Sequence, residues 1–93
     1  MDVPSVGRLV CSKKGRDKGN YYIITRVIND RLVEAANGSN RKLKNPKKKN
    51  VKHLKLYFLV DEELGDAIRA KSAKDEELFR ALNKLLQEIN NQE

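Results

Sequence analysis

The sequence predicts a small, mainly β fold followed by α-helix at the C-terminus. Short runs of β-branched and aromatic residues recur at intervals of about 8 to 12 residues and are separated by turn-forming residues. After Val60 the apolar residues change to a helical period. Five short strands in so short a segment are typical of a small barrel or sandwich. We therefore expect a five-stranded β domain over residues 1–58 and a helical extension over residues 59–93.

The first two strands are expected on either side of a basic loop. Residues 7–12 have β-compatible side chains, and residues 21–28 are mostly β-branched or aromatic. Between them, Gly15 and Gly19 can adopt positive φ angles and close a tight loop. This pattern predicts a strand, a loop over residues 13–20 and a second strand.

Two further strands are expected around a hairpin turn. Residues 32–35 form the third predicted strand, and Asn37-Gly38 is a strong two-residue hairpin signal that places a fourth strand at 41–44. Asn45-Pro46 ends that strand, because proline has no N–H to donate to a sheet ladder.

A fifth strand is predicted after a lysine-rich turn. The turn is expected at residues 47–50, where three lysines precede an asparagine. Over 51–58, one set of side chains alternates with another, which suggests a strand; the sets are Val51, His53, Lys55 and Tyr57 against Lys52, Leu54, Leu56 and Phe58.

Two helices are predicted after the strands. Asp61 can cap a short helix, which Gly65 weakens by about 1 kcal/mol relative to alanine. Residues 72–75 resemble a capping box with Asp at its fourth position, so a longer helix is expected from about Lys74 to Asn90. Its apolar residues form one stripe: Leu78, Phe79, Leu82, Leu85, Leu86 and Ile89. The stripe can dock on the β domain, dimerise or bind another protein, and docking requires no further partner.

Charge is distributed unevenly along the chain. The net charge is +7, with +11 in residues 1–57 and −4 in residues 58–93. Residues 41–55 alone hold eight basic side chains and no acid. So dense a patch repels itself unless a polyanion neutralises it, which indicates a nucleic-acid partner.

Other function classes find little support in the sequence. Cys11 has no cysteine partner for a disulfide or a zinc site, and His53 is the single histidine, so we expect no metal and no cofactor. The carboxylates over 61–66 are explained by the helix dipole, and we expect no enzyme. Without a signal peptide or an apolar membrane span, a cytoplasmic protein that does not enter the membrane is expected.

A glycine-spaced motif in the first half resembles a known family. Gly7-Arg-Leu-Val-Cys-Ser-Lys-Lys-Gly15-Arg-Asp-Lys-Gly19, continuing to Ile23-Ile24 and Val27-Ile28, resembles the KOW motif of ribosomal and transcription-elongation proteins. It is most similar to the large-subunit ribosomal protein family numbered fourteen in eukaryotes and archaea, with its small bacterial relatives. The resemblance covers about residues 6–57 and implies an SH3-like barrel that binds RNA, commonly ribosomal RNA, possible contacts with ribosomal proteins, and a nonenzymatic role.

The expected RNA-binding residues are cations around the glycine loop and in the second basic run, with one aromatic residue. Lysine and arginine neutralise phosphates and release counterions, and an exposed aromatic ring can stack on a base. Tyr21 and Tyr22 point to opposite faces of their strand, so at most one of them is free to stack. The predicted set is Lys13, Lys14, Arg16, Lys18, Tyr21, Arg41, Lys42, Lys44, Lys47, Lys48, Lys49 and Lys52.

Two other functions remain open from sequence alone. An adaptor of the transcription or translation machinery would use the β domain and anchor a protein on the apolar face of the last helix. For either function we expect a monomer. DNA binding is less well supported, because the predicted helices are acidic and do not suit the major groove.

Overall fold

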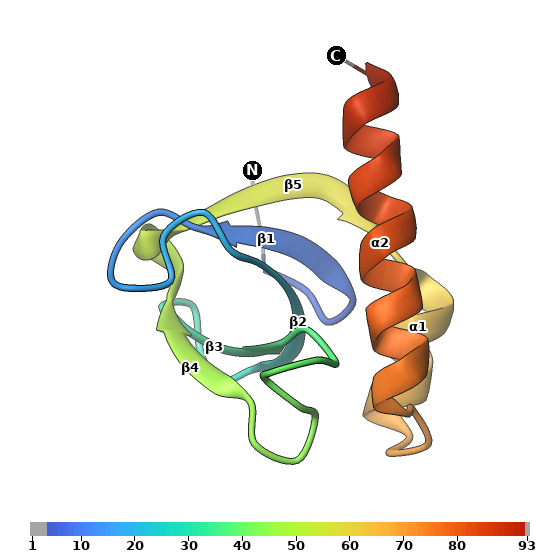
Figure 1. Ribbon diagram of the computed structural model, residues 1–93. Coiled ribbons are helices and arrows are strands. Elements are labelled where there is room, and N and C mark those ends of the chain that lie inside the picture. Colours follow the sequence, from blue (N-terminus) through green and yellow to red (C-terminus); the bar gives the residue numbers. More distant parts are fainter. Residues whose placement is uncertain (1–3, 93) are drawn as a thin grey trace.

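The computed structural model describes residues 4–92 (Figure 1). Five antiparallel strands are followed by two helices, which confirms the predicted fold class, mainly β with C-terminal α. The elements are β1 (Arg8–Ser12), β2 (Tyr21–Val27), β3 (Leu32–Ala36), β4 (Lys47–Asn50), the 3-10 turn η1 (Val51–His53), β5 (Leu54–Val60), α1 (Glu62–Arg69) and α2 (Asp75–Gln92).

The strands form one strongly curved sheet in the order β4-β3-β2-β1-β5 (Figure 1). Each strand pairs antiparallel with its neighbour, for example Leu9 with Ile23 between β1 and β2. The two edge strands, β4 and β5, are not joined by a ladder within the described residues. The sheet is therefore open, and the closed barrel expected from the sequence is not confirmed.

The fourth strand is the clearest error of the sequence prediction. Residues 41–44 form no strand, and β4 is instead the lysine-rich segment 47–50 that was expected to be a turn. The predicted two-residue hairpin turn is also wrong, because Asn37-Gly38 belongs to a wider loop in which both N–H groups donate to the Arg41 carbonyl. The chain then continues without a strand to Pro46. Pairing with β3, which opposes Lys49 to Val33, overrides the low β propensity of lysine.

The predicted fifth strand is shifted toward the C-terminus. Its first residues, 51–53, form η1, whose N-cap Asn50 accepts a hydrogen bond from the Lys52 N–H through its side chain. β5 then runs over 54–60 at the sheet edge opposite β4.

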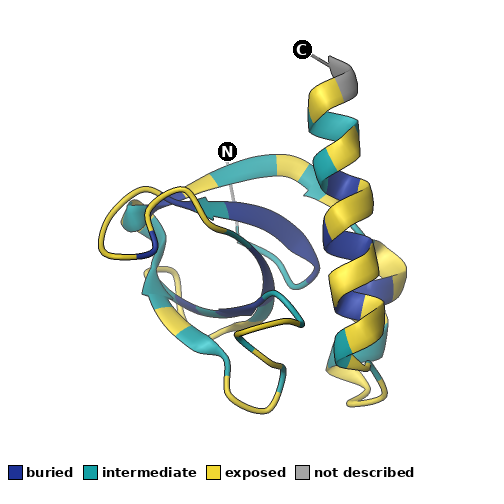
Figure 2. Cartoon of the chain, in the orientation of Figure 1, coloured by how far each residue is buried: buried dark blue, intermediate teal, exposed yellow. Residues whose placement is uncertain are grey.

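Side chains alternate between two cores, one on each face of the sheet. Val10, Ile24 and Val33 belong to a cluster in the concave face of the sheet. Leu9 and Ile23 belong to the other cluster, together with Leu64 of α1 and Leu78 of α2. The helices lie outside the curve of the sheet, and buried segments occur on both the strands and α2 (Figure 2). The convex face is thus buried by α1 and α2.

The short helix α1 begins as predicted at the Asp61 cap, whose Oδ1 accepts a hydrogen bond of 3.0 Å from the Leu64 N–H. Gly65 has a packing role that the sequence did not reveal. A Cβ at this position would lie 2.8 Å from the Val6 carbonyl oxygen, so only glycine permits this close approach.

The long helix α2 docks on the sheet within the same chain. Leu78, Leu82 and Leu85 are buried against the sheet and α1. The capping interaction lies two residues later than predicted. The Lys74 N–H donates a 3.2 Å hydrogen bond to Glu77 Oε1, and within the described residues Asp75 makes no such capping contact. Asp75 instead accepts a 2.8 Å hydrogen bond from the N–H of Leu43, which ties the β3–β4 loop to the helix start.

Candidate nucleic-acid interface

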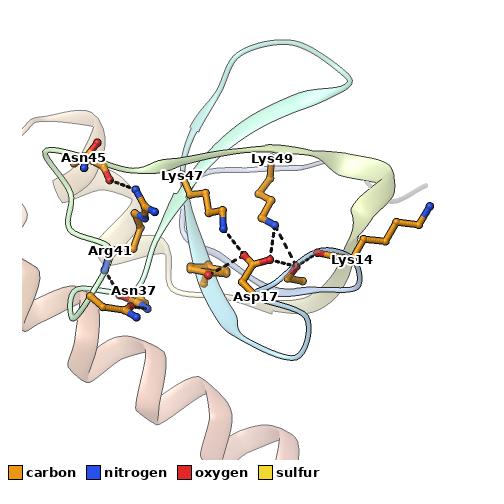
Figure 3. A network of polar contacts seen from close by, with 10 residues as sticks. Lys14, Asp17, Asn37, Arg41, Asn45, Lys47 and Lys49 are labelled. Atoms are coloured by element: carbon orange, nitrogen blue, oxygen red, sulfur yellow. Dashed lines mark hydrogen bonds and ion pairs between the residues drawn. The ribbon is translucent and has the colours of Figure 1, made fainter.

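A buried carboxylate organises the basic part of the molecule. Asp17, in the loop between β1 and β2, is only 8% exposed. Its Oδ1 accepts hydrogen bonds from Ser12 Oγ at 2.9 Å and Lys49 Nζ at 2.8 Å. Its Oδ2 accepts one from Tyr22 OH at 2.9 Å and pairs with Lys47 Nζ at 3.0 Å (Figure 3). We call these five residues the Asp17 cluster; they join β1, β2, β4 and the loop.

The protonation state of Asp17 follows from this geometry. Burial alone raises the pKa of the carboxyl group, but hydrogen bonds from Lys49, Lys47, Tyr22 and Ser12 outweigh it and hold the pKa well below its ordinary value. Asp17 is therefore ionised at neutral pH and neutralises part of the charge of the two lysines.

Two of the predicted RNA-binding lysines are thus engaged inside the protein. The side chain of Lys49 is 10% exposed and that of Lys47 is 33% exposed, and both ammonium groups point at Asp17 (Figure 3). A phosphate would have to compete with Asp17 for them. Lys48 lies between them on β4, is exposed, and is paired in register with Glu34 of β3.

The loop over residues 13–19 is closed by its own backbone hydrogen bonds. Gly19 N–H donates to the Ser12 carbonyl at 2.9 Å, and Lys18 N–H donates to the Gly15 carbonyl at 3.2 Å. Gly15 and Gly19 have φ angles of 91° and 92°, as their spacing predicted. The loop therefore has a defined shape, and it exposes the side chains of Lys13, Lys14, Arg16 and Lys18.

The second basic run meets this loop at η1. The N–H of Lys13 donates to the carbonyl of His53 at 2.8 Å, which places the turn beside the loop. Local desolvation and the positive charges of nearby lysines all lower the pKa of His53; the lysines are Lys14, Lys52, Lys49 and Lys13. Two segments far apart in sequence thus create one positive field. We call the exposed cations here the loop surface: Lys13, Lys14, Arg16, Lys18 and Lys52.

Arg41, Lys42 and Lys44 belong to a different part of the molecule, the β3–β4 loop. Arg41 is half-buried, and its Nη1 lies 3.5 Å from the carbonyl oxygen of Asn45 (Figure 3). Lys44 lines a hollow shared with Arg26 of β2 and Lys71, which follows α1. The twelve predicted residues are therefore not brought together into one site.

The two tyrosines have the opposed orientations that strand geometry predicts. Tyr22 is buried and donates to Asp17, whereas Tyr21 is half-buried on the face of the sheet that the helices cover. The Tyr21 ring packs against Tyr57, with centroids 6.1 Å apart and planes tilted by 41°. The ammonium of Lys55 lies 4.8 Å from the Tyr57 ring centroid. Tyr21 therefore packs partly against the convex core and partly against Tyr57.

Sequence reasoning missed the central role of Asp17. The available signal was the single acid inside a basic glycine loop, since a lone carboxylate among lysines is a natural ion-pair partner. Its two lysine partners lie about thirty residues away and were unpredictable without the fold.

No protein-family model matches the chain, and a search of curated proteins found no match. Within residues 4–92, no helix has the length and apolar character needed to cross a membrane. The same residues contain no cluster of three or more His, Cys, Asp or Glu side chains that could hold a metal ion.

Proposed function

We propose that this chain is a nonenzymatic RNA-binding protein whose loop surface contacts phosphates. The observation that carries the proposal is the meeting of two distant basic segments at His53 and Lys13. The side chains of this surface are exposed, whereas the lysines that maintain the fold are turned toward Asp17. Charged groups in a fixed array neutralise a polyanion at a low entropic cost.

The Asp17 cluster supports this function indirectly. It fixes the loop to β4 through Lys47 and Lys49, so the remaining cations of the loop are held on a rigid frame. Recognition of RNA shape and backbone follows from this arrangement, because aromatic rings for stacking are few.

The identity of the RNA is proposed from the glycine-spaced motif over residues 7–19. Its resemblance to the KOW motif favours ribosomal RNA as the ligand and a cytoplasmic role in translation, with ribosomal proteins as neighbours. Crosslinking in cells followed by sequencing of the bound RNA tests this part. We expect enrichment of ribosomal RNA, and recovery of the protein without enriched RNA would contradict it.

The adaptor function is less well supported by the structure. It required the apolar face of α2 to anchor a partner, but Leu78, Leu82 and Leu85 are at most 5% exposed because they pack on the sheet. RNA binding is therefore the function that the geometry favours.

Fluorescence anisotropy with a labelled, structured RNA tests the loop surface directly. The triple variant Lys13→Ala/Lys14→Ala/Lys52→Ala removes three exposed cations from it. We expect weaker binding and a log K against log salt slope that is smaller by about 2, at roughly 0.7 per phosphate contact.

A matched control removes the same charge from α2 and from Lys74, the residue just before it. The variant Lys74→Ala/Arg80→Ala/Lys84→Ala takes three exposed cations from the other side of the molecule, and we expect little change in the salt slope. Equal losses in both variants would show that net charge alone, rather than the loop surface, determines binding.

A further inference from the structure

The most exposed large apolar side chain of the described residues lies on β5. Phe58 is 86% exposed, and Val60 on the same strand is 39% exposed. The guanidinium of Arg8 lies 5.4 Å from the Phe58 ring centroid, on one face of the ring. The ring is therefore held by a neighbour while most of its surface faces solvent.

The strand that carries Phe58 is an edge of the sheet. β5 pairs with β1 on one side and has no strand on its other side within residues 4–92. An edge strand leaves backbone N–H and C=O groups available to another extended chain, which can add to the sheet.

An acidic groove lies beside this edge. Two adjoining hollows of about 450 and 470 Å³ share Asp61, Glu63 and Lys84 and run between the end of β5, the start of α1 and the adjacent flank of α2. Phe58, Val60 and Leu85 supply apolar surface to one of them. The groove contains five carboxylates against the cations Arg80 and Lys84; the carboxylates are Asp61, Glu62, Glu63, Glu77 and Glu88.

Several of these carboxylates are available to a ligand. Asp61 Oδ1 and Glu77 Oε1 accept hydrogen bonds from backbone N–H groups at the starts of the two helices. Glu62, Glu63 and Glu88 form no ion pair with any described residue. The groove thus combines unneutralised negative charge, an exposed aromatic ring and a sheet edge.

We propose that β5 and this acidic groove bind an extended, lysine- or arginine-rich peptide segment that carries an apolar side chain for Phe58. The peptide adds as a strand to β5, its apolar residue packs on the ring, and its cations face Glu62, Glu63 and Glu88. Residues two apart in a strand point to the same face, so an apolar residue with cations two positions away can reach the hollow that Phe58 lines together with Glu62 and Glu88.

Charge complementarity selects this occupant over a second copy of the chain. Two copies joined β5 to β5 about a two-fold axis would bring their like-charged grooves together, which is unfavourable. A basic segment instead supplies the opposite charge. The groove lies on the helical side of the molecule and the loop surface lies at the far side of the sheet (Figure 1), so the two sites can be occupied together.

A labelled peptide of about eight residues, the length of an ordinary strand, is a direct probe. It carries one valine with a lysine two residues before it and another two residues after it, and serine at the other positions. We expect anisotropy to show binding to the full chain, and Phe58→Ala to weaken it by at least about tenfold, a difference that is easily measured. Glu88→Lys should also weaken it. Phe79→Ala is the matched control, since Phe79 is an aromatic residue that is 45% exposed and does not line the groove.

Two further measurements make the test decisive. A peptide in which serine replaces valine should bind at least about tenfold more weakly, because it lacks the side chain for Phe58. In a ¹H–¹⁵N NMR titration, the amide shifts should concentrate at residues 57–63. Shifts elsewhere, unchanged affinity in Phe58→Ala, or a dimer in light scattering that Phe58→Ala abolishes would each overturn the proposal.

This inference stands apart from RNA binding. Phe58→Ala should leave the RNA affinity and its salt slope unchanged. Loss of RNA binding in that variant with intact peptide binding would contradict the groove assignment.

Discussion

Lys49 places its ammonium 2.8 Å from Asp17 Oδ1, although 32 residues separate the two in sequence. Both side chains are nearly buried, at 10% and 9% exposure. The pair connects the glycine loop to the edge strand β4, so the position of the basic loop depends on a contact between two distant segments.

Neutralising Asp17 should destabilise the fold. Asp17→Asn leaves the ammonium groups of Lys47 and Lys49 without a counter-charge in a partly buried site, and we expect the free energy of unfolding to fall by about 2 to 3 kcal/mol. Urea denaturation measures this fall in the free energy of unfolding. Asp66→Asn is the control, because the Asp66–Arg69 pair is exposed and contributes about 0.5 kcal/mol or less. Similar losses in both variants would contradict a central role for Asp17.

Stability should decline in acid because of the same carboxyl group. Its pKa is lowered in the folded protein from an ordinary value of 3.8, so the stabilisation is complete above that value and is lost as the pH falls toward the lowered pKa. Urea midpoints at about pH 6, 4 and 3 measure the decline. The decline should be smaller in Asp17→Asn. Parallel plots of urea midpoint against pH for the two proteins would show that Asp17 is not its cause.

Substitution by alanine should destabilise the protein to different extents at two glycines with nearly equal φ angles. Gly7 and Gly19 have φ of 93° and 92°, so both substitutions strain the backbone by about 1 kcal/mol or more. A Cβ at Gly7 would also lie 2.5 Å from the Asp61 carbonyl oxygen, whereas nothing lies within 4 Å at Gly19. We expect Gly7→Ala to lose at least about 2 kcal/mol more than Gly19→Ala in urea denaturation. An equal loss would show that α1 moves away freely.

Replacing Lys71 with glycine should stabilise the protein. Lys71 has φ of 60° and follows α1, where its N–H donates to Ile68 and the next N–H, of Ser72, donates to Ala67. This is a Schellman arrangement, in which glycine is the preferred residue. Lys71→Gly should raise stability by about 0.5 to 1 kcal/mol in thermal unfolding, after the entropy of the unfolded chain is included. Lys71→Ala removes the same charge without relieving the backbone, so a gain of equal size there would refute the explanation.

Local signals predicted most of the fold. The strands near 8–12, 21–27 and 32–36 follow from β-branched runs between glycine and asparagine turns, and α2 follows from its apolar period. The error at 41–44 has a physical cause: lysines at 47–49 have weak intrinsic β preference, but pairing with β3 and contact with Asp17 stabilise them as a strand. Neither interaction is visible in a short window of sequence.

The candidate site was predictable in composition and not in arrangement. Charge density identified the cations of residues 13–18, which are exposed in the structure. It could not separate Lys52, which joins them, from Lys49, which is turned inward, because both belong to the same run. The groove at Phe58 was not predicted, because no neighbouring residue in the chain indicates that Phe58 projects from a sheet edge.

The convex core has a practical consequence for anyone shortening this chain. Leu9, Ile23 and Ala36 are fully buried there against Leu78 and Leu85 of α2. A fragment ending after β5 would expose an apolar surface of β1, β2 and β3 to solvent, and we expect such a fragment to aggregate. Because the strands and the helices share this core, we expect them to unfold together in one cooperative transition.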